Sequence, residues 1–188
     1  MSSGIISFES LLEFVKRNSE IPHRKSDSTV FNQYQELFMK LIADVPEVPG
    51  WYFWIGSSDN PDRGYVYIGQ AQSKKTASLH NRLEKELHVE YVGLWATIHG
   101  DNAIVDIIRK YSRYETQIKR AARKWGTTHV IWYSQEGLTK DQLNFVENKL
   151  ITIYKPRANK KKPRYMHEYP SLFETVFKEF NVLLQNAS

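Results

Sequence analysis

The sequence contains no cysteine among its 188 residues. Disulfide bonds and zinc sites built from thiolates are therefore excluded. The six histidines are scattered along the chain, and no pair of them has a recognisable zinc-binding spacing. No zinc site is therefore predicted from the cysteines or the histidines.

Long apolar runs are also missing from the chain. No segment approaches the roughly 18 apolar residues that a membrane-spanning helix requires. The first residues, MSSGIISFES, lack the basic start and the sustained apolar stretch of a secretory signal. We therefore expect a cytoplasmic protein with no membrane partner.

Positive charge is abundant but localised. The net charge is +5, although residues 101–125 alone carry +4 and residues 155–164 carry +6, so the remainder of the chain is negative. A localised basic surface is typical of polyanion binding, whereas the alternative is a solvated face with a basic tail. The candidate nucleic-acid contacts in the two segments are Arg113, Lys119, Arg120, Arg123, Lys124, Lys155, Arg157, Lys160, Lys161, Lys162 and Arg164.

The order of predicted elements favours an α+β fold. Apolar periodicity, capping residues and breakers predict helices at 7–17, 30–43, 77–88, 101–125, 140–154 and from 171 onward. Aromatic and β-branched runs predict strands at 51–55, 65–68 and 128–134. The helix at 140–154 has the strongest start signal, because Thr139 and Gln142 form a capping-box pattern.

Glu147 breaks the pattern of that helix. On a wheel of roughly 100° per residue it projects between Leu143 and Ile151, inside the apolar stripe. A carboxylate in such surroundings costs several kcal/mol unless it is paired or binds a cation. Two interpretations remain open, a salt bridge to a nearby Arg or Lys and a catalytic or metal-binding role.

Arg82 lies on the flank of the apolar stripe of the 77–88 helix, and Glu86 follows one turn later on the same flank. An Arg–Glu pair at this spacing is often a surface contact worth about 0.3–0.5 kcal/mol. The alternative is an arginine that Glu86 holds and presents to a phosphate.

The tyrosines of the first two strands are the third anomaly. Strand alternation places Tyr67 and Gly69 on one face, and we expect Tyr52 and Tyr67 to face the side covered by the helices of Arg82 and Glu147. Aromatic cross-strand packing is the alternative for both tyrosines. A glycine at a strand end allows close approach of another backbone or of a ligand.

Four segments resemble, in order, the motifs of the GIY-YIG nuclease superfamily. They are PGWYFW at 49–54, VYIGQA at 66–71, LHNRLEKE at 79–86 and ENKLITIYKPRAN at 147–159, the last two being most similar to the type II restriction endonuclease branch. Trp51 stands where isoleucine is usual. The resemblance implies a catalytic set of Tyr52, Tyr67, Arg82, Glu147 and Asn159, with Tyr154 and Pro156 in the Y-x-P that follows the glutamate.

The resemblance also implies the architecture. We expect a GIY-YIG fold with a small three-stranded antiparallel sheet flanked by helices, in a single domain of residues 1–188. The nuclease core would span 49–159 with a helical insertion at about 89–127. An N-terminal helical extension would occupy 1–48, and a basic segment with a final helix would occupy 160–188.

The implied activity is Mg²⁺-dependent hydrolysis of phosphodiester bonds in double-stranded DNA, with Mn²⁺ as a substitute ion and with 5′-phosphate and 3′-hydroxyl ends. Glu147 would hold the metal, Arg82 would bind a phosphate oxygen, and Tyr52 would be the general base. The ordinary tyrosine pKa of about 10 is high for that role, but a nearby arginine favours the phenolate. Tyr67 would orient the water or the phosphate, and Asn159 would fix the local geometry.

One departure affects the supporting residues. Members of the superfamily often have a histidine four residues after the arginine, where this chain has Glu86. Either His80 or His88 would take its role, or the role is absent.

Two other functions remain open at this point. One is a structure-specific repair or mobile-element nuclease, and the other is a non-catalytic nucleic-acid-binding module with the same fold. Symmetric cleavage of both strands would imply a homodimer, formed through the N-terminal helices.

Overall fold

The computed structural model describes residues 1–7, 10, 13, 28–56, 65–72, 77–84, 127–156, 159 and 167–187. The elements in chain order are β1 (Ser2–Ser7), α2 (Ser28–Ile42), β2 (Gly50–Gly56), β3 (Tyr65–Ala71), β4 (Thr127–Ser134), α6 (Lys140–Tyr154) and α7 (Pro170–Asn186). Residues 79–84 form a further short helical segment. The predicted α+β class is confirmed.

The strands form one 4-stranded antiparallel sheet in the order β1-β4-β2-β3. The central strand β2 is buried over most of its length because it has neighbours on both sides and helices on both faces. The predicted strands at 51–55, 65–68 and 128–134 correspond to β2, β3 and β4. β3 is the outer strand on one side of the sheet, and β1 is the outer strand on the other.

The sheet has four strands rather than the predicted three, and the additional strand is β1. Ser7, the predicted cap of a helix, is instead the last residue of this strand and lies opposite His129. The N-terminal extension is therefore not purely helical. The six residues SSGIIS form a strand because they pair with β4, which lies more than a hundred residues away in the sequence. A local pattern this short carries no signal of that pairing.

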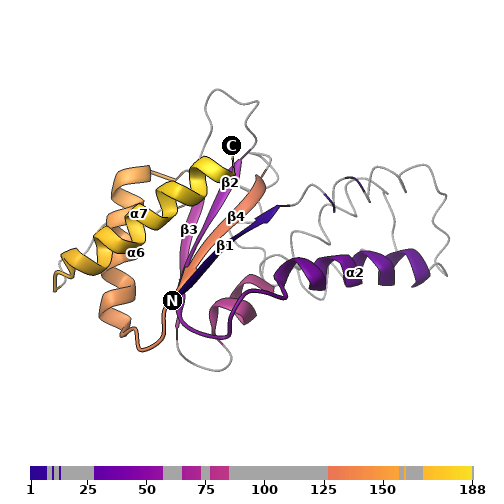
Figure 1. Cartoon of the computed structure of the whole chain (residues 1–188), viewed down its shortest axis with the longest axis horizontal. Helices are drawn as coiled ribbons and strands as arrows, with labels where there is room; N and C mark the ends of the chain where they lie inside the picture. The colour runs from indigo at the N-terminus through magenta and orange to yellow at the C-terminus, as the bar shows by residue number, and fades with distance from the viewer. Residues whose placement is uncertain are drawn as a thin grey trace.

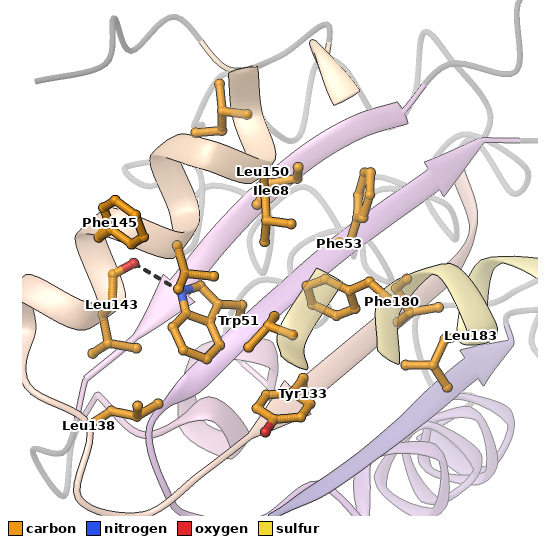
Figure 2. Close-up of a cluster of buried hydrophobic side chains, with 14 residues drawn as sticks. Trp51, Phe53, Ile68, Tyr133, Leu138, Leu143, Phe145, Leu150, Phe180 and Leu183 are labelled. Carbon is orange, nitrogen blue, oxygen red and sulfur yellow. Dashed lines mark hydrogen bonds between the residues drawn. The ribbon is translucent and has the colours of Figure 1, made fainter. Parts of the chain in front are cut away.

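The two helices α6 and α7 cover one face of the sheet (Figure 1). Side chains of β2, β3 and β4 pack there against both helices in one buried cluster, part of which Figure 2 shows. Trp51 and Phe53 are the β2 members of this cluster, and Phe180 is one of its α7 members. The cluster fixes both helices on the sheet, since buried apolar area is the main stabilising term in folding.

The opposite face of the sheet carries α2 and the helical segment 79–84 (Figure 1). Backbone hydrogen bonds attach that segment to the loop after α2: Leu79 N–H donates to the Val48 carbonyl and His80 N–H donates to the Pro46 carbonyl. The expectation that the helices of Arg82 and Glu147 cover the same side is therefore wrong. The segment that carries Arg82 lies on one face, and α6 packs on the other.

The ends of α6 follow the sequence signals. The Thr139 side chain accepts a hydrogen bond from Gln142 N–H, and the Gln142 side chain accepts one from Thr139 N–H, which completes the capping box. Lys155 ends the helix in the left-handed conformation with φ 46°, immediately before Pro156. Local contacts therefore define both ends of α6.

Several predicted features lie outside the described residues. They include most of the helix expected at 7–17, where Ser7 belongs to β1 and only Ser10 and Glu13 are described as helical, and the whole helix expected at 101–125. Among the helices that the structure describes, none is long and apolar enough to cross a membrane.

Candidate active site

Tyr52 and Gly69 are directly opposite each other on β2 and β3. The Tyr52 side chain is fully buried, and a Cβ atom added to Gly69 would overlap its Cζ and Oη atoms and lie 2.8 Å from Cε1 of Tyr67. The absence of a side chain at Gly69 is therefore what lets the phenol of Tyr52 lie over β3. The close approach expected at this glycine was of a backbone or a ligand, whereas the structure has the Tyr52 ring there.

Tyr67 lies beside Tyr52 on the same face. The two ring centroids are 6.0 Å apart with the planes tilted by 48°. Tyr67 is only half-buried, whereas Tyr52 is enclosed. The pair therefore has one phenol in the protein interior and one near solvent, so both of the sequence-based interpretations, packing and chemistry, remain compatible with the geometry.

Arg82 reaches this pair from the helical segment. Its Nε–H donates a hydrogen bond to Tyr52 Oη over 3.3 Å. The Arg82 residue as a whole is exposed, so its guanidinium connects a buried phenol to the surface. Sequence analysis identified both residues separately, and the fold joins them.

Asn159 binds the backbone of β3. Its Oδ1 accepts from Ile68 N–H over 2.9 Å, and its Nδ2 donates to the Ile68 carbonyl over 2.8 Å. One amide side chain thus replaces the missing neighbour of this outer strand, between Tyr67 and Gly69. Asn159, five residues after the end of α6, therefore lies at the outer edge of β3.

Glu147 lies on α6 and is 2% exposed. The helix packs against β3 and β2, and residues around Glu147 belong to the apolar cluster. The sequence-based expectation of a buried carboxylate in an apolar stripe is confirmed. Because ionised carboxylates avoid apolar surroundings, this position requires compensating polar or cationic contacts.

The donor chemistry of Glu147 fits a hard cation. Within the described residues, no three His, Asp or Glu side chains gather as a preformed metal site. A single carboxylate suits Mg²⁺, which keeps several waters and usually takes few protein ligands besides substrate phosphates.

His80 has a different environment from Arg82. Its Nδ1 lies 2.9 Å from the Val45 carbonyl, so this nitrogen carries the proton and donates. At roughly 100° per residue, His80 and Arg82 lie on opposite flanks of the Leu79–Leu83 stripe. His80 thus anchors the helical segment to the loop after α2, on the flank away from Tyr52.

The remaining predicted residues are mostly beyond the described positions. Lys155 is described and exposed at the end of α6. The others lie outside the described residues: Glu86, His88, Arg113, Lys119, Arg120, Arg123, Lys124, Arg157, Lys160, Lys161, Lys162 and Arg164.

Sequence analysis missed the contact that starts the Arg82 segment. Ser78 is 1% exposed, and its Oγ accepts hydrogen bonds from Asn81 N–H over 3.3 Å and from Asn81 Nδ2 over 2.8 Å. This is an N-cap, and the sequence SLHN held its signal, a serine followed by an amide residue three positions later.

Two contacts between the sheet and α6 were also missed. Trp51 and Gln70 both hydrogen-bond to α6 from the face opposite Tyr52. The sequence signal for Trp51 was its substitution of the usual isoleucine, since an indole adds a donor that isoleucine lacks.

In comparisons with known proteins, no family model, curated protein or solved structure matches the chain.

Proposed function

We propose that this protein is a Mg²⁺-dependent endonuclease of the GIY-YIG type that hydrolyses phosphodiester bonds in double-stranded DNA. The observation that carries the proposal is the hydrogen bond from Arg82 Nε to Tyr52 Oη, at the notch left by Gly69. This bond joins two residues that the sequence motifs pair in the same chemistry. Restriction-type cleavage at a specific sequence, leaving 5′-phosphate and 3′-hydroxyl ends, is the form of activity we propose.

Burial of the Tyr52 ring disfavours its ionised form, and the neighbouring arginine opposes that effect. A guanidinium beside a phenol favours the phenolate, because the positive charge stabilises the ionised form. Arg82 is exposed as a residue, and a guanidinium has the fork geometry that binds phosphate oxygens. Arg82 would thus bind the scissile phosphate and hold Tyr52 beside the attacking water.

Tyr67 and Asn159 complete the polar surroundings of that face. Tyr67 is half-buried next to Tyr52, in a position to orient the water or the phosphate. Asn159 holds the backbone of β3 at Ile68, so the residues on either side keep their places while the substrate binds.

Glu147 would hold the metal ion. It lies on α6, which packs on the other face of the sheet from Arg82 and contacts β3, the outer strand that also carries Tyr67. Bound Mg²⁺ would supply positive charge that neutralises the phosphate and stabilises the leaving 3′-oxygen. The basic segments at 101–125 and 155–164 would contact the DNA backbone, which carries no sequence information by itself.

Incubation with plasmid DNA and Mg²⁺ tests the proposal. Discrete bands support sequence-specific cleavage, a smear supports nonspecific or structure-specific cleavage, and intact DNA overturns the nuclease assignment. Omitting Mg²⁺ or adding a chelator should leave the plasmid intact.

Glu147→Ala should abolish Mg²⁺-dependent cleavage, since it removes the only carboxylate proposed for the metal. Tyr52→Phe should lower the cleavage rate by about 10²–10⁴-fold, the usual contribution of a general base, because it removes the hydroxyl and keeps the ring. Both rates are measured on one plasmid under single-turnover conditions, with folding checked by circular dichroism.

Glu174→Ala is the matched control, because Glu174 is an exposed carboxylate on α7. It should cleave like the wild-type protein. If Glu147→Ala cleaves at the wild-type rate, Glu147 does not hold the metal, and if Tyr52→Phe does so, Tyr52 is a packing residue.

A further inference from the structure

A cross-strand pair on the face opposite Tyr52 makes two polar contacts with α6. Trp51 and Gln70 are direct partners in the β2–β3 register. Trp51 Nε1–H donates to the Leu143 carbonyl over 2.9 Å, as the dashed line in Figure 2 shows. Gln70 Nε2–H donates to Asn144 Oδ1 over 2.6 Å. One strand pair therefore binds two consecutive residues of the helix.

Those two helical residues belong to the turn that leads to Glu147. In an α-helix the carbonyl of Leu143 also accepts from the backbone N–H of Glu147, four residues later. Trp51 therefore donates to the same carbonyl that holds the Glu147 backbone. Asn144 precedes Glu147 by three residues, so its side chain lies on a neighbouring part of the helical surface.

Hydrogen bonds add directional restraints to the apolar packing that holds α6 on the sheet. Hydrophobic attraction is non-directional, whereas hydrogen bonds have narrow limits of distance and angle. The Trp51 contact is made to the helix backbone, and the Gln70 contact is made to a side chain of the next residue. Together they restrict sliding of α6 along the strands and rotation about its own axis.

The Gln70 contact is poorly optimised for stability. Its Oε1 atom is buried and has no hydrogen-bond partner within the described part of the chain. A buried acceptor without a partner destabilises the fold, and an apolar side chain at this place would avoid that cost. Stability alone therefore does not account for an amide at this position, whereas positioning of the helix does.

We propose that Trp51 and Gln70 are positioning residues that set the place of Glu147 relative to Tyr52. Trp51 adjoins Tyr52 in β2, and Gln70 adjoins Gly69 in β3. The same two backbone segments thus carry the phenol on one face and the contacts to α6 on the other. This inference rests on the proposed nuclease function, and neither side chain touches the reacting atoms.

Gln70→Leu tests the inference most directly. It removes the contact to Asn144 and the unpartnered oxygen together, so the melting temperature should be unchanged or higher. The value of kcat should nevertheless fall by about tenfold to a hundredfold, the scale of a small misplacement of a catalytic group, while KM for DNA stays constant. Trp51→Phe should lower kcat similarly, with some loss of melting temperature.

A length exchange provides a rescue. Gln70→Asn shortens one amide, Asn144→Gln lengthens the other, and each single variant should lose kcat. The double variant restores an amide pair of the original combined length, so kcat should recover. Tyr133→Phe is the matched control, because its hydroxyl donates to Gln135 beside the same cluster and does not reach α6.

A measurement without cleavage separates this inference from the proposed function. The ¹³C signal of the Glu147 side-chain carboxyl, assigned through Glu147→Gln, should shift in Gln70→Leu and stay in place in Tyr133→Phe. If the wild-type protein cuts no DNA, the proposed function fails, and this signal alone decides the positioning role. An unchanged signal, a retained kcat or an equal loss in Tyr133→Phe overturns it.

Discussion

Tyr52 illustrates how one side chain can serve packing and chemistry at once. Its ring is fully buried, yet its hydroxyl is bonded to an exposed arginine. Gly69 makes this arrangement feasible, because any side chain opposite Tyr52 would occupy the volume of the phenol. The position of the candidate base thus depends on a missing methyl group on the neighbouring strand.

Gly69→Ala should therefore reduce both stability and cleavage. Overpacking of a tight site usually costs about 1–3 kcal/mol, and relief of the overlap requires the Tyr52 ring or β3 to move. Urea denaturation measures the first effect, and single-turnover cleavage well below the melting temperature measures the second.

Gly137→Ala is an informative control for that variant. Gly137 has φ 73° and open space around its Cβ position, so alanine there strains the backbone without touching Tyr52. It should lose stability and keep its cleavage rate. If Gly69→Ala matches the wild-type protein in both measurements, β3 accommodates the methyl group and the notch has no role.

At the scale of elements, the junction of α6 and α7 is built from aromatic rings. Tyr154 lies between Phe53 at 5.0 Å, Tyr65 at 4.9 Å and Phe177 at 5.8 Å, measured between ring centroids. Its hydroxyl donates to Asn181 Oδ1 on α7 over 2.8 Å. Burial, and secondarily the charge of Tyr65, raises the pKa of Tyr154 to about 12.

The raised pKa predicts a loss of stability at alkaline pH. An unfolded tyrosine has a pKa of about 10, so the unfolded chain releases this proton first as the pH rises. The contribution of the neutral phenol is therefore complete below about pH 10 and disappears towards the folded-state value of about 12. Urea midpoints measured from pH 8 to 11 should fall less steeply for Tyr154→Phe than for the wild-type protein.

Parallel pH curves for the two proteins would contradict that assignment. Tyr133 provides an internal reference, because its pKa is raised in both proteins. Burial is the larger cause and the charge of Glu179 is the smaller one. The difference between the curves thus isolates Tyr154.

The elements that sequence analysis predicted correctly have local signals. Thr139 and Gln142 mark the start of α6, and the aromatic density of β2 marks a buried strand. β1 has no such signal, since its strand conformation depends on pairing with β4. Strand alternation also does not predict which face α6 covers, because Trp51 and Phe53 on one face and Tyr52 and Trp54 on the other are all fully buried.

The candidate site was predictable to a similar extent. Strand alternation places Tyr67 and Gly69 on one face, and periodicity identifies Glu147 as buried, whereas the pairing of Tyr52 with Gly69 comes from the strand register of the structure. The bond between Arg82 and Tyr52 and the binding of Asn159 to Ile68 depend on how distant segments meet. No spacing rule contains that information, so only the resemblance joined these residues in advance.

For the whole molecule, the distribution of charge is the feature that bears on DNA. Residues 101–125 carry +4 and residues 155–164 carry +6, which exceeds the net charge of +5 for the chain. The side chains of these two segments lie mostly outside the described residues. What can be predicted for these segments is therefore their effect on DNA binding, and not the position of their side chains. Each lysine that neutralises a phosphate releases counterions and contributes about 0.9 to the salt slope of binding.

Replacing Lys160, Lys161 and Lys162 with alanine should weaken DNA binding. The slope of the logarithm of the binding constant against the logarithm of the salt concentration should become shallower by up to about 2.7. Fluorescence anisotropy with a labelled duplex at several salt concentrations measures the slope. The matched control replaces Lys40, Lys140 and Lys178, which are exposed on α2, α6 and α7. Equal slopes for the two triple variants would show that the segment is not a specific part of the footprint.

The pairing of β1 with β4 has a consequence for synthesis of the chain. Ser2 and Ser134 are bonded to each other across 132 positions. At about 5–20 residues per second, a ribosome needs roughly 7–26 s to travel between them. During that time the β1 segment has no strand to pair with. Its backbone N–H and C=O groups therefore stay unpaired by β4 until β4 has been synthesised.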